Sequence, residues 1–264
     1  NAGDLDVAGQ VEEFWLAQRD VEEGCAAAAD QQLKAGKLKP HTAWLRARLG
    51  MENDRLRIAT QAIGLLNPEW AITAGSIYAN PERYLNEKIT ALRPRTKELV
   101  TLALIRLAVS DPEAAAIEAD KLRWKAQLTL EERSWVWGVI GKRAAQKLSD
   151  GAVTYFLNGQ DKFMHDDHLA WKVRSALRAS NWDQVTTAIA AMSETQRKDP
   201  TWVYWRARAL LNRAQTEADR AEASHLLGSI ASTRGFYEQL ALEELGHRVT
   251  APERPLPLTD EEKE

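Results

Sequence analysis

The sequence of 264 residues contains one cysteine, no run of 18 apolar residues and no excess of basic charge. A lone cysteine cannot form an internal disulfide, and no group of cysteines and histidines has the spacing of a zinc site. The absence of a long apolar run predicts that no transmembrane segment is present. The formal net charge is −3 with both signs interspersed, which argues against a nucleic-acid-binding protein because such proteins carry a basic face.

Motifs of common catalytic sites are missing as well. The chain has no glycine-rich phosphate loop, no GxSxG motif and no HExxH motif. The first residues, Asn1 to Asp4, include no Met and no signal-type apolar core, which we interpret as a removed leader or a piece cut from a longer protein. Cys25 has two open interpretations: a small buried apolar residue, or one half of a disulfide whose partner lay upstream.

Helix starts are clearly marked in what is present. Four positions place a capping Asn or Asp directly before a proline, at Asn67-Pro68, Asn80-Pro81, Asp111-Pro112 and Asp199-Pro200. The capping side chain accepts a hydrogen bond from a free helical N–H, and proline at the first helical position has no N–H to satisfy. Thr129 and Glu132 have the spacing of a capping box. Each of these positions predicts the first turn of a helix.

Apolar periodicity extends these helices and predicts an all-α fold. Apolar residues recur at helical spacing in 98–108 and 183–192, and in 202–211 they mark two faces. A helix that is apolar on two faces packs on both, as helices in a solenoid do. The strand-like run at 153–156 is interpreted as helical. The segments are short and joined by polar turns such as 178–181 and 194–198, so we expect antiparallel helix pairs in a tetratricopeptide-like α-solenoid.

An internal repeat supports this architecture. The stretches WKVRSAL (171–177) and WRARALL (205–211) are 34 residues apart, the length of a tetratricopeptide unit, and WLRARLG (44–50) is a more distant copy. The Leu-Gly and later Pro of the full tetratricopeptide pattern are not met. The repeats therefore indicate an irregular rather than a regular array. Most of the ten tryptophans lie in helix-period segments, where we expect them to pack between helices.

The segment FMHDDHLAW (163–171) is most like a site. His165 and His168 share one helix face and could bind a metal, whereas Asp166 and Asp167 point apart. The competing interpretation is that the two aspartates cap and charge the start of a helix that runs to Leu177. Because no third ligand is present, we favour the second interpretation and predict no metal and no cofactor.

Other charged residues also have a simple interpretation. Adjacent glutamates do not converge on one substrate in a helix, so we assign them to solvated faces or helix starts. Arginines near tryptophans could line a groove for an acidic ligand, or they could pair with acids and lie over Trp rings, and we favour the latter. The glutamate pairs are Glu12-Glu13, Glu22-Glu23, Glu131-Glu132 and Glu243-Glu244, and the arginines are Arg46, Arg48, Arg174, Arg206 and Arg208.

Two stretches near the end of the chain carry a resemblance. DPTWVYWRARALL (199–211) and RGFYEQLALEELG (234–246) are similar to the last helices of the superhelical domain of soluble lytic transglycosylases, and looser similarity extends back to 25–51, 110–122 and 167–182. We also expect the last stretch to pack an apolar side and to end at Gly246 in a left-handed cap. The matching signature residues are Trp202, Tyr204, Trp205, Arg234, Gly235, Phe236 and Tyr237, and the apolar side comprises Phe236, Tyr237, Leu240, Ala241 and Leu245.

The resemblance implies a right-handed superhelix or ring of helices in the periplasm, with the outer membrane as a further expected association. In the family a lysozyme-like domain follows and cleaves the β-1,4 bond between N-acetylmuramic acid and N-acetylglucosamine through one Glu in a Glu-Ser motif, leaving a 1,6-anhydromuramoyl end. This sequence has no Glu-Ser dipeptide, so no catalytic residue carries over. In the family a cysteine like Cys25 pairs with one upstream.

These observations give three expected segments: a leading helical segment at 1–24, a superhelical domain at 25–249 and the start of a linker at 250–264. We expect the chain alone to be inactive and to hold and orient glycan strands of peptidoglycan or protein partners, with other cell-wall enzymes as candidates. The alternative is a stand-alone helical-repeat adaptor that binds peptides. The substrate-binding surface stays unknown at this point.

Overall fold

The computed structural model describes residues 7–88, 90–214 and 216–248. These residues form two compact units, the first ending at Gln184 and the second beginning at Val185. The expected linker at 250–264 lies outside the described residues. Helices make up the described structure and no strand occurs in it, so the expected all-α fold is confirmed. No helix among the described residues is long and apolar enough to span a bilayer.

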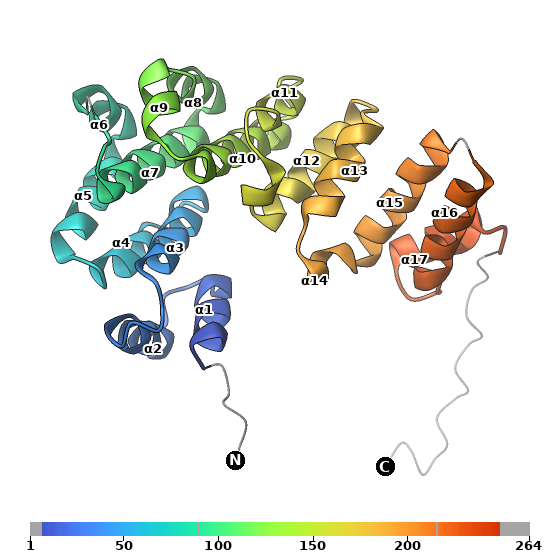
Figure 1. Cartoon of the computed structure of the whole chain (residues 1–264), viewed down its shortest axis with the longest axis horizontal. Coiled ribbons are helices and arrows are strands. Elements are labelled where there is room, and N and C mark those ends of the chain that lie inside the picture. Colours follow the sequence, from blue (N-terminus) through green and yellow to red (C-terminus); the bar gives the residue numbers. More distant parts are fainter. Residues whose placement is uncertain (1–6, 89, 215, 249–264) are drawn as a thin grey trace, which may run out of the picture. The chain divides into compact units, whose positions relative to one another are not determined.

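The first unit is built from short helices (Figure 1). They are α1 (Val7–Ala17), α2 (Glu23–Lys34), α3 (Pro40–Glu52), α4 (Leu56–Gly64), α5 (Pro68–Ala79), α6 (Pro81–Glu87), α7 (Pro94–Ser110), α8 (Pro112–Ala119), α9 (Leu122–Gln127), α10 (Leu130–Gln146), α11 (Ala152–Phe156), the 3₁₀ helix η1 (Asp161–Phe163) and α12 (Asp166–Arg178). The boundary between the units falls within α13 (Trp182–Ala191).

Successive helices of the first unit pack as pairs, among them α3 with α4, α7 with α8 and α10 with α11. The connections between them are short, so the paired helices run antiparallel. The longer helices α3, α7, α10 and α12 also pack on one another in that order. A hydrophobic core with large buried side chains such as Trp44, Leu104 and Ile140 joins α3, α7 and α10. The predicted antiparallel pairs are therefore confirmed in this unit.

The predicted helix starts are confirmed atom by atom. Asn67 accepts a hydrogen bond from the Glu69 N–H at 2.8 Å, and Asp111 accepts one from the Ala114 N–H at 2.9 Å. The side chains of Asn80 and Asp199 cap α6 and α15 in the same way. At the start of α10, Thr129 and Glu132 exchange the hydrogen bonds of the predicted capping box. These local contacts fix where each helix begins.

The second unit contains α14 (Glu194–Arg197), α15 (Pro200–Arg213), α16 (Glu217–Ile230) and α17 (Phe236–Glu244). Residues 194–198, expected to be a polar turn, instead contain a single helical turn capped by Ser193. The predicted end of α17 is confirmed: Gly246 has φ of +83° and His247 donates to the carbonyl of Leu242 at 3.0 Å, which is the Schellman arrangement.

One packing expectation for α17 is wrong. Phe236 was assigned to the apolar side of this helix, but its side chain is 70% exposed. It is the first residue of α17 and does not belong to the core of the unit, and its ring meets that of Tyr237 edge to face, with 5.2 Å between ring centres. The other expected members lie against the small core of the unit, with Ala241 fully buried.

Candidate functional site

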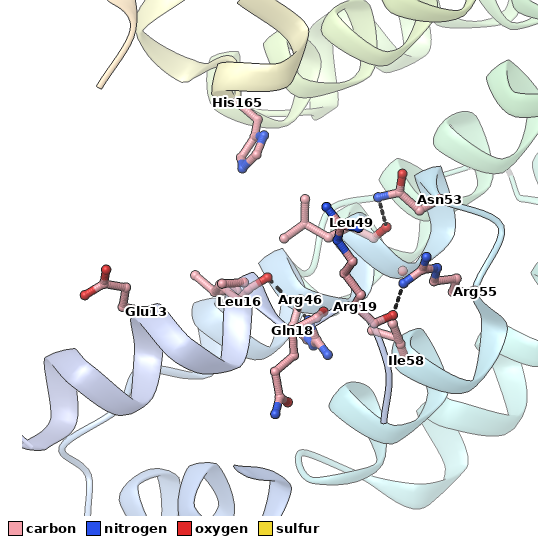
Figure 2. A pocket seen from close by; sticks show the side chains of 12 residues that line it. Glu13, Leu16, Gln18, Arg19, Arg46, Leu49, Asn53, Arg55, Ile58 and His165 are labelled. Carbon is pink, nitrogen blue, oxygen red and sulfur yellow. Dashed lines mark hydrogen bonds between the residues drawn. The ribbon is translucent and has the colours of Figure 1, made fainter. Parts of the chain in front are cut away.

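A groove of about 700 Å³ opens in the first unit between the end of α1, the second half of α3, the start of α4 and the start of α12 (Figure 2). Apolar, amide and positively charged side chains line it together. The lining residues are Glu13, Leu16, Ala17, Gln18, Arg19, Arg46, Leu49, Gly50, Asn53, Arg55, Ile58 and His165.

Two arginines build one wall of this groove. The buried Arg46 of α3 donates to the carbonyls of Leu16 at 3.3 Å and Asp20 at 3.2 Å, and it also donates to the carbonyl of Gln18. Arg55 donates to the carbonyl of Arg19. The last carbonyls of a helix have no partner within the helix, and a cation favours that end of the helix dipole. These arginines therefore anchor the end of α1 and the loop after it against α3 and α4.

Other polar groups of the lining keep free hydrogen-bonding capacity. Arg19 is exposed, and its side chain makes no hydrogen bond or ion pair with the part of the chain described. Asn53 uses its amide N–H to bond the Leu49 carbonyl at 2.9 Å, which leaves its oxygen as an acceptor. His165 projects from the start of α12 toward the groove (Figure 2). The surrounding protein atoms partly desolvate the ring and lower its pKa, and the nearby His168 lowers that pKa further, so the ring is neutral at neutral pH.

A buried charge cluster involves Glu52, which directly precedes Asn53 of the groove lining. Glu52, at the end of α3, is 1% exposed and binds Lys142 of α10 at 2.8 Å and His168 of α12 at 2.9 Å. Lys142 also pairs with Asp167. Burial alone would raise the pKa of Glu52, but His168 and Lys142 outweigh it and hold that pKa well below its usual range. The carboxylate is therefore ionised, and it joins three helices.

A second buried cluster involves α3, α7 and α10. Arg48 of α3 is fully buried, binds both oxygens of Glu98 at 3.0 Å and also pairs with Glu131. Its guanidinium lies 5.4 Å from the ring centre of Trp135, within cation–π range. Burial, with two further glutamates nearby, outweighs Arg48 and raises the pKa of Glu98 to about 7. Glu98 is not part of the groove lining.

Most of the segment predicted to be most site-like has a structural role, although His165 also lines the groove. His168 uses both ring nitrogens, one for Glu52 and one to accept the backbone N–H of His165 at 3.3 Å. The aspartates do charge the first turn of α12, but the expectation that they cap it is wrong. The cap is His165, whose Nδ1 accepts the Asp167 N–H at 3.3 Å. The described residues contain no group of three or more potential metal ligands from His, Cys, Asp and Glu.

The arginines and glutamates largely follow the favoured interpretation. Arg206 pairs with Glu222 at 2.9 Å, Arg208 pairs with Glu244, and Arg174 lies over the Trp171 ring at 5.0 Å. Arg46 lines the groove between α1, α3, α4 and α12, and Arg174 lines a separate pocket beside Trp171. Glu131 and Glu132 lie in the first turn of α10, as expected for helix-start charges. Glu12 accepts a hydrogen bond from Thr42 at 2.7 Å.

Cys25 and the signature residues occupy different units. Cys25 is a free, half-buried thiol packed against the core of the first unit. In the second unit, Trp205 donates weakly to the Tyr237 hydroxyl at 3.4 Å, and Tyr204 lies 5.5 Å from the Tyr237 ring. Trp202 and Tyr204 are buried. Tyr204, Trp205 and Tyr237 of the signature therefore form an aromatic contact between α15 and α17.

Sequence reasoning missed the buried clusters and the groove. Glu52 and Lys142 are 90 residues apart, and Arg48 and Glu98 are 50 apart. A lone Glu or Lys on a helix reads as solvent-facing unless its partner is known. Two signals were available: Arg46 was considered as a groove residue, and His165 lay in the segment most like a site.

Comparisons with known proteins agree with the resemblance seen in the sequence. No family model matches the chain. Over 256 residues it is 23% identical to the soluble lytic murein transglycosylase of Escherichia coli K12, covering 93% of this chain and 38% of that protein. The protein of that name from Salmonella typhimurium LT2 is 22% identical over 256 residues, covering 95% and 39%. The chain is similar to soluble lytic murein transglycosylases.

Solved structures show a similar fold. The chain matches an inactive mutant of the lytic transglycosylase Slt from Pseudomonas aeruginosa with a TM-score of 0.55 and 22% identity, over 91% of this chain and 39% of that one. The 70-kDa soluble lytic transglycosylase of Escherichia coli matches with a TM-score of 0.54 and 21% identity, over 94% and 41%. The chain spans about two fifths of the length of these relatives.

Proposed function

We propose that this chain is the non-catalytic superhelical part of a periplasmic lytic transglycosylase. The observation that carries the proposal is the similarity to soluble lytic murein transglycosylases over 93% of the chain. The parent enzyme would cleave the bond between N-acetylmuramic acid and N-acetylglucosamine, and this part would hold and orient glycan strands or other cell-wall enzymes beside the catalytic domain.

The carboxylates of the chain support a non-catalytic role. Glycosidic bond cleavage requires a carboxylic acid placed against the bond in a cleft. Glu13 is the one carboxylate in the groove lining, and its side chain is exposed on α1 rather than enclosed in a cleft. Glu52 is buried and held ionised, so it has no proton to donate. Glu98 has a raised pKa, but it is bound to Arg48 within a helix interface.

Digestion of purified sacculi tests the proposal. The 264-residue chain and the full-length product of its gene are incubated separately with sacculi, and the released fragments are identified by mass spectrometry. We expect 1,6-anhydro-muropeptides from the full-length product only. Release by the chain alone would overturn the non-catalytic assignment. A reading frame without a downstream Glu-Ser segment would favour the alternative, a helical-repeat adaptor that binds peptides.

A further inference from the structure

We infer that the groove between α1, α3, α4 and α12 binds a muramyl peptide, meaning a sugar that carries a short peptide with free carboxylates, and that Arg19 contacts a carboxylate of this ligand. The choice of a peptidoglycan fragment rests on the proposed function. The size, the charge and the free polar groups of the groove stand independently of it.

The size of the groove suits a small ligand. Its volume of about 700 Å³ falls within the range of roughly 300–1,000 Å³ that is usual for ligand sites. Leu16, Leu49 and Ile58 provide apolar surface, while Gln18 and Asn53 add amides. Sites of this kind bind a ligand through an apolar surface and orient it through a few polar groups. The space fits a sugar and a few amino acids rather than a folded protein partner.

The charge of the lining favours an anion. Arg46 and Arg55 donate their hydrogen bonds to backbone carbonyls, which are neutral and do not cancel the positive charges. Arg55 approaches one carboxylate, Asp20, at 4.0 Å, with both side chains exposed. The lining itself contributes Glu13 as its carboxylate against three arginines. A concave surface with this excess of positive charge concentrates anions.

Free donors and acceptors complete the match. The guanidinium of Arg19, which has no partner in the described structure, offers two parallel N–H donors to a carboxylate. The Asn53 oxygen can accept a hydrogen bond from a peptide or acetamido N–H. The neutral His165 ring has its Nδ1 bound to the Asp167 N–H, so Nε2 remains to donate to a carbonyl or a sugar hydroxyl.

Calorimetric titration of the full 264-residue chain tests the inference. Three probes are compared: a disaccharide tetrapeptide from peptidoglycan, the same disaccharide without peptide, and the free tetrapeptide. We expect the disaccharide tetrapeptide to bind most tightly and its Kd to rise with salt. Arg19→Gln should weaken binding about tenfold or more, the loss typical of a hydrogen bond to a charged group. Arg57→Gln is the control, because Arg57 is exposed on α4 outside the groove lining.

A second variant examines the opposite wall. His165→Asn keeps a good capping side chain at the start of α12 but withdraws the imidazole from the groove. It should weaken binding without lowering the unfolding temperature. Equal affinity of the Arg19 and Arg57 variants, or no binding by the natural chain, would overturn the site. If the free tetrapeptide binds as tightly as the disaccharide tetrapeptide, the muramyl part of the inference fails and the ligand is an acidic peptide.

The two proposals fail separately. If the full-length product releases anhydro-muropeptides while the groove variants bind normally, the groove inference falls and the proposed function stands. If the groove variants lose binding while the full-length product releases none, the groove stands as a binding site and the assignment to a transglycosylase falls.

Discussion

Replacing Lys142 with Met should destabilise the first unit severely. Lys142 is 4% exposed and lies 2.8 Å from the carboxylate of Glu52, itself 1% exposed. Met keeps most of the apolar stem and removes the charge. Glu52 would then be left with one partner, His168, and removing one member of a buried ion pair costs about 3–5 kcal/mol.

The cost of protonating Glu52 has a similar magnitude. The variant can avoid a buried charge by protonating Glu52, whose unperturbed pKa is 4.5. Protonating such a group at pH 7 costs about 3.4 kcal/mol, because each pH unit is worth about 1.36 kcal/mol. The free energy of unfolding should therefore fall by about 3 kcal/mol at pH 7, measured by urea unfolding. The matched control is Lys34→Met, which breaks an exposed pair with Asp30 and should cost at most about 0.5 kcal/mol.

The pH dependence of this loss gives a second test. Glu52 has a lowered pKa in the folded natural chain, so its contribution is present above about pH 4.5 and is lost as the pH falls further. In the Lys142→Met variant the carboxyl is no longer held ionised by Lys142, and acid makes its protonation easier. The gap between the two proteins should therefore shrink from pH 7 toward pH 4. A gap that stays constant, or a loss no larger than that of Lys34→Met, would refute the reasoning.

Three further outcomes are expected. Gly138→Ala should destabilise the chain by about 1–3 kcal/mol, because a Cβ there would lie 2.6 Å from Nδ1 of His168. Gly75→Ala is the control: a Cβ added there meets no neighbouring group within 4 Å, so this change should stabilise the chain by about 0.5–1 kcal/mol. Thermal unfolding distinguishes the two variants. The raised pKa of Glu98 means that the natural fold loses stability as the pH rises from 4.5 to above 7 and this carboxyl ionises. Glu98→Gln cannot ionise, so its stability relative to the natural chain should increase over this range by up to about 3 kcal/mol, measured by urea unfolding. Asp111→Ala removes the cap of α8 and should cost about 1 kcal/mol in the same assay.

Helix positions could be predicted from the sequence because they depend on neighbours in the chain. The Asn67 cap reaches two and three residues ahead, and Pro68 fixes the first turn by its own ring. The cap of α12 was assigned to the wrong residues for a related reason: His is not among the preferred capping side chains, and adjacent Asp166 and Asp167 made a stronger local signal. Phe236 was misplaced because periodicity gives a helix face but not how far the partner helix extends along it.

The groove and the buried clusters could not be predicted, because their members come from helices far apart in the chain. Arg46 and Arg48 lie two residues apart in the same repeat-like stretch, 44–50. Arg46 nevertheless binds a carbonyl at the end of α1, whereas Arg48 binds Glu98 of α7. What differs is the helix that packs against each side of α3. That information lies in tertiary packing and is absent from the local pattern.

The buried cluster also explains how the groove keeps its width. Glu52 follows closely on Leu49 and Gly50 of the groove wall, and its carboxylate binds His168, one helical turn after His165. A slip of α12 by one turn, about 5.4 Å, would break the Glu52 contact and leave a charge buried without that partner. A hydrophobic contact would tolerate such a slip more easily, because it has no direction. These charges therefore hold His165 at a fixed position relative to α3, as a site for a small ligand requires.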